Sequence, residues 1–442
     1  MSEKKISSEI PSSNKHSDSS QTHLILGLAR SGKAVASFFE RNGTPYIVYD
    51  DKGIADRNAS AEPNAIVLDQ MDQIDWDKIA VVVQSPGVPF SFPTPHPITA
   101  MAQQRGIPIK TDIDLFNENR PIKKLCVGIT GTNGKSTTTA LITHILNENG
   151  LKAEMGGNIG VPALTLLDQP EISVYVLELS SFQLEATQRI DLDVAVITNI
   201  AEDHLDRHGS MENYIKAKQR IFNHASHCLV GSDCPDIGIG PSSIASLQGA
   251  HNQENMRIAY AVCAKLGLSD AGIRQAIQTF PGLSHRMELV YTCSDFFIVN
   301  DSKATNADST RRALDHYTAD SNIHIYWIAG GKSKQGGIES LAPFFKTIKK
   351  AYFIGAAQEA FLKIAEGSLD AKACFDLETA VKAAFADIRA EARLNTSMGR
   401  DLKRRYLMLF SPACASFDQF IDFEDRGETF KKIACSNLKK RA

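Results

Sequence analysis

From His23 onward, short apolar runs alternate along the chain with stretches of helical periodicity. The first block contains the runs LILGLA, YIVYD and IAVVVQSPG; the second contains KKLCVGIT, SVYVLELS and DVAVITNI; the third contains DFFIVND, IHIYWIAGG, AYFIG and RRYLMLF. Short, almost wholly apolar strands separated by helices are typical of parallel sheets that helices cover on both faces. The pattern therefore predicts an α/β protein built from three such blocks.

The blocks also suggest domain boundaries. We predict a disordered tail over residues 1–22, a first domain over 23–112, a central domain over 113–283 and a C-terminal domain over 284–442. The tail is rich in serine and lacks the apolar segment of a signal peptide. The proline-rich FSFPTPHP could be a linker, but IPIKTDIDLF after it is typical of a strand and short helix of the first block.

Composition narrows the classes of partner. The 442 residues include 48 Lys and Arg against 51 Asp and Glu, a net charge of -3, which argues against a nucleic-acid-binding protein. No apolar run approaches the roughly 18 residues of a membrane helix, so we expect no membrane insertion. The eight cysteines form no CxxC pair, which indicates reduced thiols and a cytoplasmic protein. The ligands that remain are small molecules.

Residues 125–142, LCVGITGTNGKSTTTALI, combine an apolar run, a glycine-rich turn and a helical pattern. This order directs backbone N–H groups and a helix N-terminus at phosphate oxygens, with a lysine for the terminal phosphates and a hydroxyl for Mg²⁺. The strict P-loop pattern needs glycine where Ile129 stands, and an ordinary glycine-rich turn is the alternative. The flanking strand and helix favour nucleotide binding, by Gly131, Thr132, Asn133, Gly134, Lys135, Ser136 and Thr137.

The string GITGTNGKST resembles the ATP loop shared by the Mur ligases of peptidoglycan synthesis and the folylpolyglutamate synthases. Both are ATP-dependent amide-forming enzymes with three domains. The resemblance implies a Rossmann-like N-terminal domain, a central P-loop ATPase-type parallel sheet and a Rossmann-like C-terminal domain. It also implies that ATP activates a carboxylate as an acyl phosphate.

Polar residues follow two further apolar runs of the central block. Glu178 ends SVYVLE, and Asn199, Asp203, His204 and Arg207 follow DVAVIT. Parallel sheets place ligands at the carboxyl ends of their strands, so Glu178 and Ser136 could hold a Mg²⁺ that bridges phosphates. The alternatives are a strand-end carboxylate paired with a cation and an exposed capping turn.

The resemblance adds roles to this block. It implies that His204 binds a second Mg²⁺, that Lys218 is carbamylated, and that Asn158 of MGGNIGVP lies near the reacting carboxylate. By itself, Lys218 would be interpreted as part of a solvated helix face, and Asn158 as part of a turn. The implied catalytic residues are Lys135, Asn158, His204 and Lys218, and the implied metal residues are Ser136, Glu178, His204 and Lys218.

Three residues around the start of the third block complete the implied nucleotide site. In the family, the residues that match Asn255, Arg286 and Asp301 approach the adenine and ribose of ATP. Each could instead cap a helix or stabilise a turn.

The first block contains a weak dinucleotide fingerprint, Gly27, Ala29 and Gly32 with Asp50 after the next strand, so an NAD-dependent oxidoreductase is an alternative from another class. Ala29 replaces the glycine that lets the backbone approach a pyrophosphate. In the D-glutamate-adding branch of the Mur ligases, this turn binds the UDP part of UDP-N-acetylmuramoyl-L-alanine. That implies Ser31, Asp50 and Ser85 as substrate residues, to which we add Arg30 on its charge alone.

The string SPACASFDQFIDFEDRG resembles the same branch. There, the residues that match Ser416, Phe417 and Phe423, with Thr305 and a lysine after the GG turn, hold the incoming amino acid. Lys332 and Lys334 both fit, and we favour Lys334.

The resemblance as a whole implies ATP-dependent ligation of D-glutamate to UDP-N-acetylmuramoyl-L-alanine, in cytoplasmic peptidoglycan precursor synthesis, by an enzyme that we expect to be a monomer. The alternatives are another Mur ligase, a folylpolyglutamate synthase-type ligase and a nucleotide sensor without turnover. The segment 223–250 is shorter than in the family, so outer strands of the central domain are expected to be missing.

Overall fold

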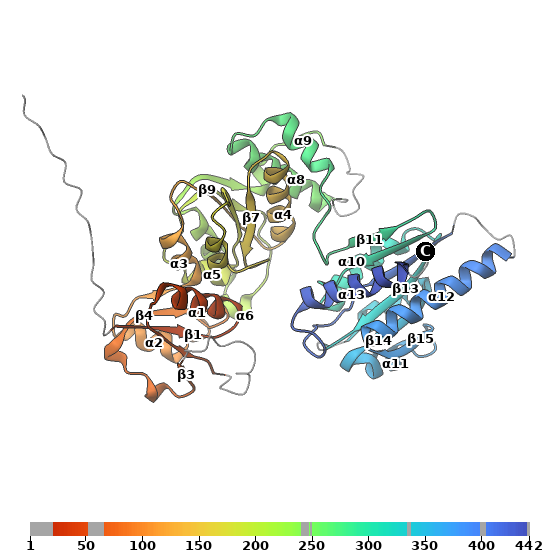
Figure 1. The fold of residues 1–442 in the computed structure, drawn as a ribbon, viewed down its shortest axis with the longest axis horizontal. Helices are drawn as coiled ribbons and strands as arrows, with labels where there is room; N and C mark the ends of the chain where they lie inside the picture. The colour runs from red at the N-terminus through yellow and green to blue at the C-terminus, as the bar shows by residue number, and fades with distance from the viewer. Residues whose placement is uncertain are drawn as a thin grey trace, which may run out of the picture. The chain divides into compact units, whose positions relative to one another are not determined.

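The computed structural model of this protein describes residues 21–51, 66–239, 247, 250–333, 337–397 and 404–439. Within these ranges the chain divides into two compact units. The first contains the residues up to Gly238 and Glu254–Ile277; the second contains Ile239–Gln253 and the residues from Gln278 onward. Two sheets belong to the first unit and one to the second (Figure 1). The tail predicted over residues 1–22 lies almost wholly outside the described residues.

The first sheet is parallel, with the strand order β3-β2-β1-β4-β5. Helix α1 presents Val35, Ala36 and Phe39 to the core at helical spacing and ends at Gly43, in the left-handed conformation that favours glycine. The proline-rich segment lies between β4 and α2, as predicted. The elements are β1 (Thr22–Leu26), α1 (Arg30–Asn42), β2 (Tyr46–Tyr49), β3 (Ile66–Leu68), η2 (Met71–Gln73), η3 (Trp76–Lys78), β4 (Ile79–Gln84), α2 (Pro97–Gln104), β5 (Ile109–Lys110) and α3 (Asp112–Asn119).

The central sheet is also parallel, with the order β10-β9-β6-β8-β7. Every residue of β8 is buried, as expected for a strand covered on both faces. Among the described residues, β10 and β7 are the edge strands of this sheet. The elements are β6 (Leu125–Thr130), α4 (Lys135–Glu148), β7 (Ala153–Gly157), η4 (Ala163–Asp168), β8 (Val174–Glu178), α5 (Ser181–Ala186), β9 (Leu192–Ile197), α6 (Leu205–His208), α7 (Met211–Gln219), η5 (Arg220–Phe222), β10 (Ala225–Val230), η6 (Gly231–Asp233), α8 (Ala250–Lys265) and α9 (Asp270–Gln278).

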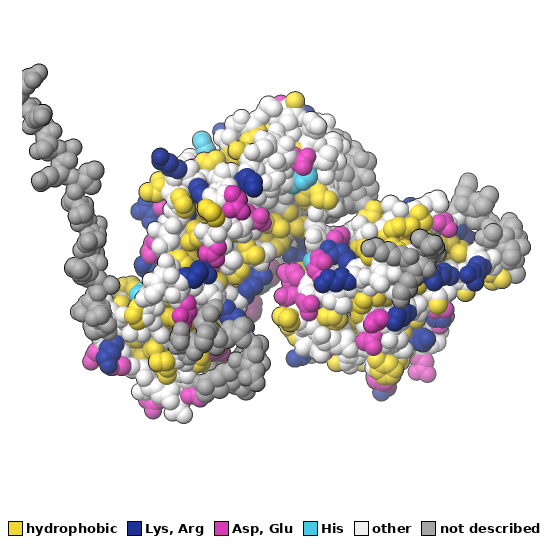
Figure 2. Space-filling view, in the orientation of Figure 1, with side chains coloured by type: hydrophobic (Ala, Val, Ile, Leu, Met, Phe, Trp, Pro, Cys, Tyr) yellow, Lys and Arg dark blue, Asp and Glu magenta, His cyan; other side chains and the backbone are white. Residues whose placement is uncertain are grey.

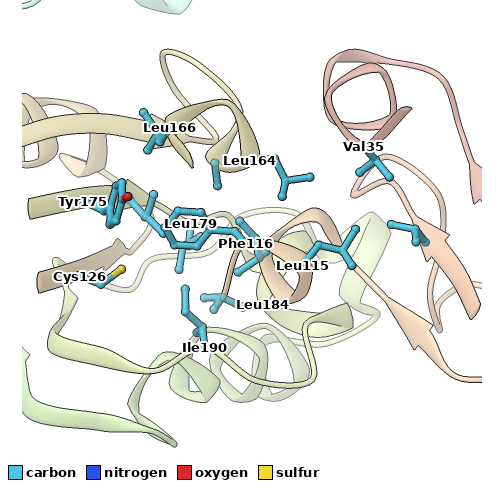
Figure 3. Close-up of a cluster of buried hydrophobic side chains, with 14 of the residues drawn as sticks. Val35, Leu115, Phe116, Cys126, Leu164, Leu166, Tyr175, Leu179, Leu184 and Ile190 are labelled. Carbon is cyan, nitrogen blue, oxygen red and sulfur yellow. The ribbon is translucent and has the colours of Figure 1, made fainter. Parts of the chain in front are cut away.

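One apolar core joins the first two sheets. Val35 of α1, Leu115 and Phe116 of α3 and Leu164 of η4 belong to a single cluster of buried side chains, which also contains Tyr175 of β8 (Figure 3). Helix α3, where we place the boundary at residue 112, thus lies inside this core. The first two sheets therefore share one apolar core and belong to one compact unit.

The third sheet has the order β11-β12-β16-β13-β14-β15 and is parallel except for β11. Separate apolar clusters cover its two faces, one including residues of α10 and α11, the other residues of α12 and α13. The elements are β11 (Glu288–Thr292), β12 (Phe296–Asn300), α10 (Ala307–Thr318), β13 (Ile323–Gly330), η8 (Glu339–Thr347), β14 (Ile348–Ile354), η9 (Gly355–Ala357), α11 (Gln358–Ala365), β15 (Ala371–Phe375), α12 (Leu377–Ser397), β16 (Arg405–Phe410) and α13 (Phe423–Lys439). The predicted α/β class with three parallel sheet regions is confirmed.

The surface matches the balanced composition. Basic and acidic side chains are intermixed on the visible face of each unit (Figure 2). Among the described helices, none combines the length and apolar character needed to cross a membrane.

Candidate active site

The glycine-rich loop of the central sheet connects β6 to α4. Gly131 and Gly134 have φ values of 145° and 80°. A Cβ on Gly131 would lie 1.9 Å from Thr198 Oγ1, and one on Gly134 would lie 2.3 Å from Asn255 Oδ1. Both conformation and space therefore require glycine here.

The loop is tied to the end of β9 before any ligand binds. The Thr132 N–H donates to Asn199 O (2.8 Å). The Asn133 N–H donates to Asn199 Oδ1 (3.0 Å), and Thr198 Oγ1 donates to Asn133 O (2.7 Å). These hydrogen bonds fix the shape of the loop before α4, and Ser136 and Thr137 follow in the first turn of the helix, the part of a helix that favours anions.

Two lysines from different parts of the sequence contact this loop. Lys135 Nζ donates to Gly131 O and to Thr132 O, both at 2.9 Å. Lys218 Nζ donates to the same Gly131 O at 2.7 Å and lies 4.7 Å from the centroid of the Tyr214 ring. Lys218 is only 2% exposed, and no salt bridge reaches it from the described residues. Burial, reinforced by the charge of Lys135, lowers the pKa of Lys218 to about 7.

Glu178, at the end of β8, is a buried carboxylate that is only half satisfied. Its Oε1 accepts a hydrogen bond from Asn158 Nδ2 (2.7 Å), whereas Oε2 is buried and has no hydrogen-bond partner. An unpaired buried acceptor costs about 1–3 kcal/mol, so this oxygen is suited to a cation that arrives with a ligand. No three Asp, Glu, His or Cys side chains gather into a metal site within the described ranges. Mg²⁺ often binds one carboxylate plus phosphate oxygens, so Glu178 and the Ser136 hydroxyl fit it.

His204 immediately precedes the short helix α6, as its N-cap, with a left-handed φ of 54°. Its Nε2 lies 3.4 Å from Asp203 Oδ2, and its ring meets the Phe182 ring edge-on at 4.9 Å. The imidazole is half exposed and hence accessible to a ligand. The next histidine, His208, is buried and contacts Ser181 Oγ (2.9 Å), so it has a structural role.

The turn after β1 in the first sheet is closed by two of the predicted substrate residues. Asp50 Oδ2 accepts from the Leu28 N–H (2.7 Å), and Ser85 Oγ donates to Gly27 O (2.9 Å). Ser31, in the first turn of α1, faces the buried Asp112, whose pKa is raised to about 6 by burial.

Arg30 has contacts that charge alone did not suggest. Its Nη2 donates to Asn158 O (3.1 Å), in the central loop whose asparagine side chain contacts Glu178. The structure therefore brings the first turn of α1 beside the Asn158 loop.

In the second unit, Asp301 follows β12 and is buried. Its Oδ2 accepts from Ser411 Oγ (2.8 Å) and its Oδ1 from the Met287 N–H (3.2 Å). Burial nevertheless raises the pKa of Asp301 to about 7. Asn255 belongs to the first unit, and Arg286 and Asp301 to the second, so their shared role at the adenine and ribose stays a prediction.

A buried arginine that we did not predict joins two loops of this unit. The Arg426 side chain donates to Ser302 O (2.7 Å), Ser302 Oγ (3.0 Å) and Cys414 O (3.0 Å). It therefore links the DSKATN loop after β12 to the SPACAS loop after β16. The sequence signal that could have indicated its burial is spacing, because Phe423, Arg426 and Phe430 recur at helical intervals on one face of α13.

Three of the predicted amino-acid-binding residues, Thr305, Ser416 and Phe417, lie in the connections after β12 and β16, and Phe423 begins α13. Ser416 is buried, Phe417 is 69% exposed, and the Phe423 ring lies 5.3 Å from Lys303 Nζ. Thr305 follows in the DSKATN loop. Lys332, after the GG turn, exchanges backbone hydrogen bonds with Ala415 (2.9 and 3.1 Å), while Lys334 lies outside the described residues. The role of Lys334 stays a prediction.

Comparison with known protein families agrees with this arrangement. Residues 129–237 match the family model described as Mur ligase middle domain, and residues 285–396 match Mur ligase, glutamate ligase domain. A relative from Phenylobacterium zucineum is 40% identical over 93% of this chain and 95% of its own length. The chain belongs to the Mur ligase family. The resemblance drawn from the ATP loop is thereby confirmed.

That relative of this Mur ligase bears the name UDP-N-acetylmuramoylalanine--D-glutamate ligase, as does one from Sphingopyxis alaskensis, 40% identical over 92% of this chain and 96% of the relative. Among solved structures, the UDP-N-acetylmuramate-alanine ligase of Thermotoga maritima aligns with a TM-score of 0.54 over 94% of this chain and 99% of that one, at 16% identity. E. coli FolC in complex with ADP aligns with a TM-score of 0.51 over 74% of this chain and 94% of that one, at 19% identity. These structures share the fold of this Mur ligase.

Proposed function

We propose that this Mur ligase joins D-glutamate to UDP-N-acetylmuramoyl-L-alanine at the expense of ATP, in the cytoplasm and for peptidoglycan precursor synthesis. The observation that carries the proposal is the 40% identity, over nearly the whole chain, to relatives with that name. Membership of the Mur ligase family argues against the alternative function, an NAD-dependent oxidoreductase. A phosphate loop in the central sheet supports ATP use.

The proposed reaction has two steps. The carboxylate of the substrate's L-alanine attacks the γ-phosphorus of ATP. The bond from this phosphorus to the oxygen that bridges it to the β-phosphorus breaks, so that ADP departs and an acyl phosphate remains. The D-glutamate amine then attacks the acyl carbon, loses a proton, and expels inorganic phosphate to leave the amide. Such phosphoryl transfer depends on positioning and on neutralising charge.

The residues of the central loop fit these steps. Lys135 can exchange its two carbonyl contacts for phosphate oxygens, because an ammonium binds a charged acceptor more strongly than a neutral one. We assign to Asn158 the orientation of the reacting carboxylate, a role supported by its hydrogen bonds to Glu178 and Arg30. When bound, Mg²⁺ would neutralise phosphate charge; Glu178 and Ser136 are the residues that would hold one ion, and His204 and a carbamylated Lys218 those that would assist a second.

We further propose that Lys218 is carbamylated. An amine whose pKa burial lowers to about 7 has a much larger neutral fraction near pH 7 than an ordinary lysine, and the neutral amine is the form that attacks CO₂; a carbamate would place a carboxylate-like group beside Gly131. Added bicarbonate should raise activity and the intact mass should increase by one CO₂. Full activity of Lys218→Ala, with no response of the wild type to bicarbonate, would refute this assignment.

The central test is phosphate release from ATP with UDP-N-acetylmuramoyl-L-alanine. We expect release that depends on D-glutamate and is absent with L-glutamate. A panel of other nucleotide precursors and amino acids separates the remaining Mur ligase and folylpolyglutamate synthase-type activities. If D-glutamate gives no stimulation, the proposed substrate is wrong. If ATP binds but no amino acid stimulates phosphate release, the protein is a nucleotide sensor.

A further inference from the structure

We propose that Arg207 is a positioning residue, which ties the turn after β4 in the first sheet to the turn that carries His204 in the central sheet. The inference rests on the proposed function, because it assumes that the β4 turn binds the uridine nucleotide and that His204 acts at the phosphate site. Both turns belong to the first unit.

Arg207 reaches from the central sheet to backbone oxygens of the first. Its Nη1 donates to Gly87 O (3.1 Å) and its Nη2 to Val88 O (3.4 Å). These carbonyls follow Ser85, the predicted substrate residue, by two and three positions. A planar guanidinium that meets two neighbouring carbonyls fixes direction as well as distance, which a lysine ammonium cannot do.

The Phe182 ring connects this contact to His204. The Arg207 guanidinium carbon lies 4.6 Å from the ring centroid. The same ring meets His204 edge-on at 4.9 Å and stacks on His208 at 5.5 Å. Because His204 has the left-handed backbone that is uncommon for residues other than glycine, its orientation depends on such outside support. A shift of Arg207 on Phe182 would therefore also move the His204 ring.

The segment after Ser85 has further contacts on the same surface. The Ser91 hydroxyl donates to Glu185 of α5. A Cβ on Gly209 would lie 2.8 Å from the Phe92 ring, so this ring packs closely on the end of the His204 turn. Gly87, Val88, Ser91 and Phe92 thus contact residues of α5, α6 or the turn that ends α6. Displacement of the β4 turn by a nucleotide would therefore be transmitted to His204 through Arg207.

The first experiment compares Arg207→Met and Arg207→Lys with Arg41→Met. Arg41 is a matched control, since it also crosses between the two sheets, to Asp168 at 3.1 Å, but contacts neither turn. We expect Arg207→Met to lower kcat for D-glutamate-dependent phosphate release by about 10- to 100-fold, as for residues that orient a metal ligand. KM for ATP should stay within about twofold, Arg207→Lys should be intermediate, and Arg41→Met should match the wild type.

The second experiment measures coupling without turnover. Amide hydrogen exchange of residues 201–209 is followed with and without UDP as the probe. We expect UDP to slow this exchange in the wild type and in Arg41→Met. In Arg207→Met the protection should vanish, although UDP still binds with an affinity within about threefold of the wild type. A purely structural role would instead raise exchange equally with and without UDP.

The inference is overturned if Arg207→Met keeps kcat within about twofold, or if UDP protects residues 201–209 in that variant as in the wild type. It is also overturned if UDP gives the wild type no protection. Should Arg207→Met not fold, Arg207→Lys provides the same two readouts. If the wild type lacks D-glutamate-dependent phosphate release but UDP protection requires Arg207, the proposed function fails and the tie between the turns stands.

Discussion

The carboxyl ends of the central and C-terminal sheets both carry candidate site residues, but they are stabilised in opposite ways. At the central edge, Lys135 and Lys218 donate to a carbonyl of the loop itself, Gly131 O. At the C-terminal edge, the buried Arg426 donates to carbonyls of two loops and so links them. The first arrangement can exchange backbone contacts for ligand contacts, whereas the second is a frame that exists before any ligand arrives.

The largest effect on activity is expected from Gly134→Ala, a substitution in the phosphate loop at the edge of the central sheet. The new Cβ would lie 2.3 Å from Asn255 Oδ1 and require a φ of 80°. We expect ATP-dependent phosphate release to fall by at least about 100-fold, the loss seen when anion-binding donors are misplaced.

Gly150→Ala is the control for this prediction. Gly150 has a φ of 82°, but a Cβ added there would meet no neighbouring atom within 4 Å, so this variant isolates the backbone cost of about 1 kcal/mol. Equal activity of the two variants would mean that the approach of Asn255 to the loop is unimportant.

Arg426→Met tests the frame at the C-terminal edge. It leaves Ser302 O and Cys414 O buried without their donor, so we expect the free energy of unfolding to fall by about 3 kcal/mol. Urea unfolding measures the loss, and KM for D-glutamate should rise with it. Arg311→Met removes only an exposed contact with Ser340 O and should be nearly neutral. A stable Arg426→Met protein with unchanged KM would contradict the idea of a preformed frame.

The free energy of unfolding should depend on pH because of Asp301, at the same edge of the C-terminal sheet. Its folded-state pKa of about 7 exceeds the ordinary value of 3.8, so the folded protein binds more protons than the unfolded chain between these values. The free energy of unfolding should therefore fall as pH rises from about 4 to 7 and level off above. Urea unfolding across this range should show a flatter profile for Asp301→Asn, and an identical profile would exclude Asp301 as the source.

The smallest effect on stability is expected at Phe417, which is 69% exposed. Phe417→Ala should change the free energy of unfolding by less than about 0.5 kcal/mol. If the ring covers bound D-glutamate, KM for that substrate should rise several-fold. Ile421→Ala, in the same segment and 82% exposed, is the control. If both variants leave KM unchanged, the frame holds the amino acid without Phe417.

Local pattern was sufficient for the strands, the glycine-rich turn and the polar residues that follow β8, β9 and β12. Strand periodicity and turn chemistry act over a few residues, so the sequence displays them directly. Arg30 is a residue whose contacts such local patterns do not predict. Its charge suggested a phosphate partner, but its contact with Asn158 O joins residues 128 positions apart, which no local pattern encodes.

Burial set the roles of two basic residues. Lys218 and Arg426 both occur in strongly polar helical stretches, MENYIKAKQ and FEDRGETFKK, where a solvated face is the ordinary interpretation. In the structure both are almost fully buried, and each donates to loop carbonyls. Only the family resemblance singled out Lys218, and the one sequence signal for Arg426 was its helical spacing with Phe423 and Phe430.

The sequence by itself determined the α/β class, the three sheet regions, the phosphate loop and membership of a family, because these depend on short-range spacing. The tertiary structure decided that the first two sheets share one core, that one carbonyl serves two lysines, and that Arg207 joins two turns. These depend on contacts between segments far apart in the chain, whose free energy comes from burial and mutual geometry and leaves no periodic trace in the sequence.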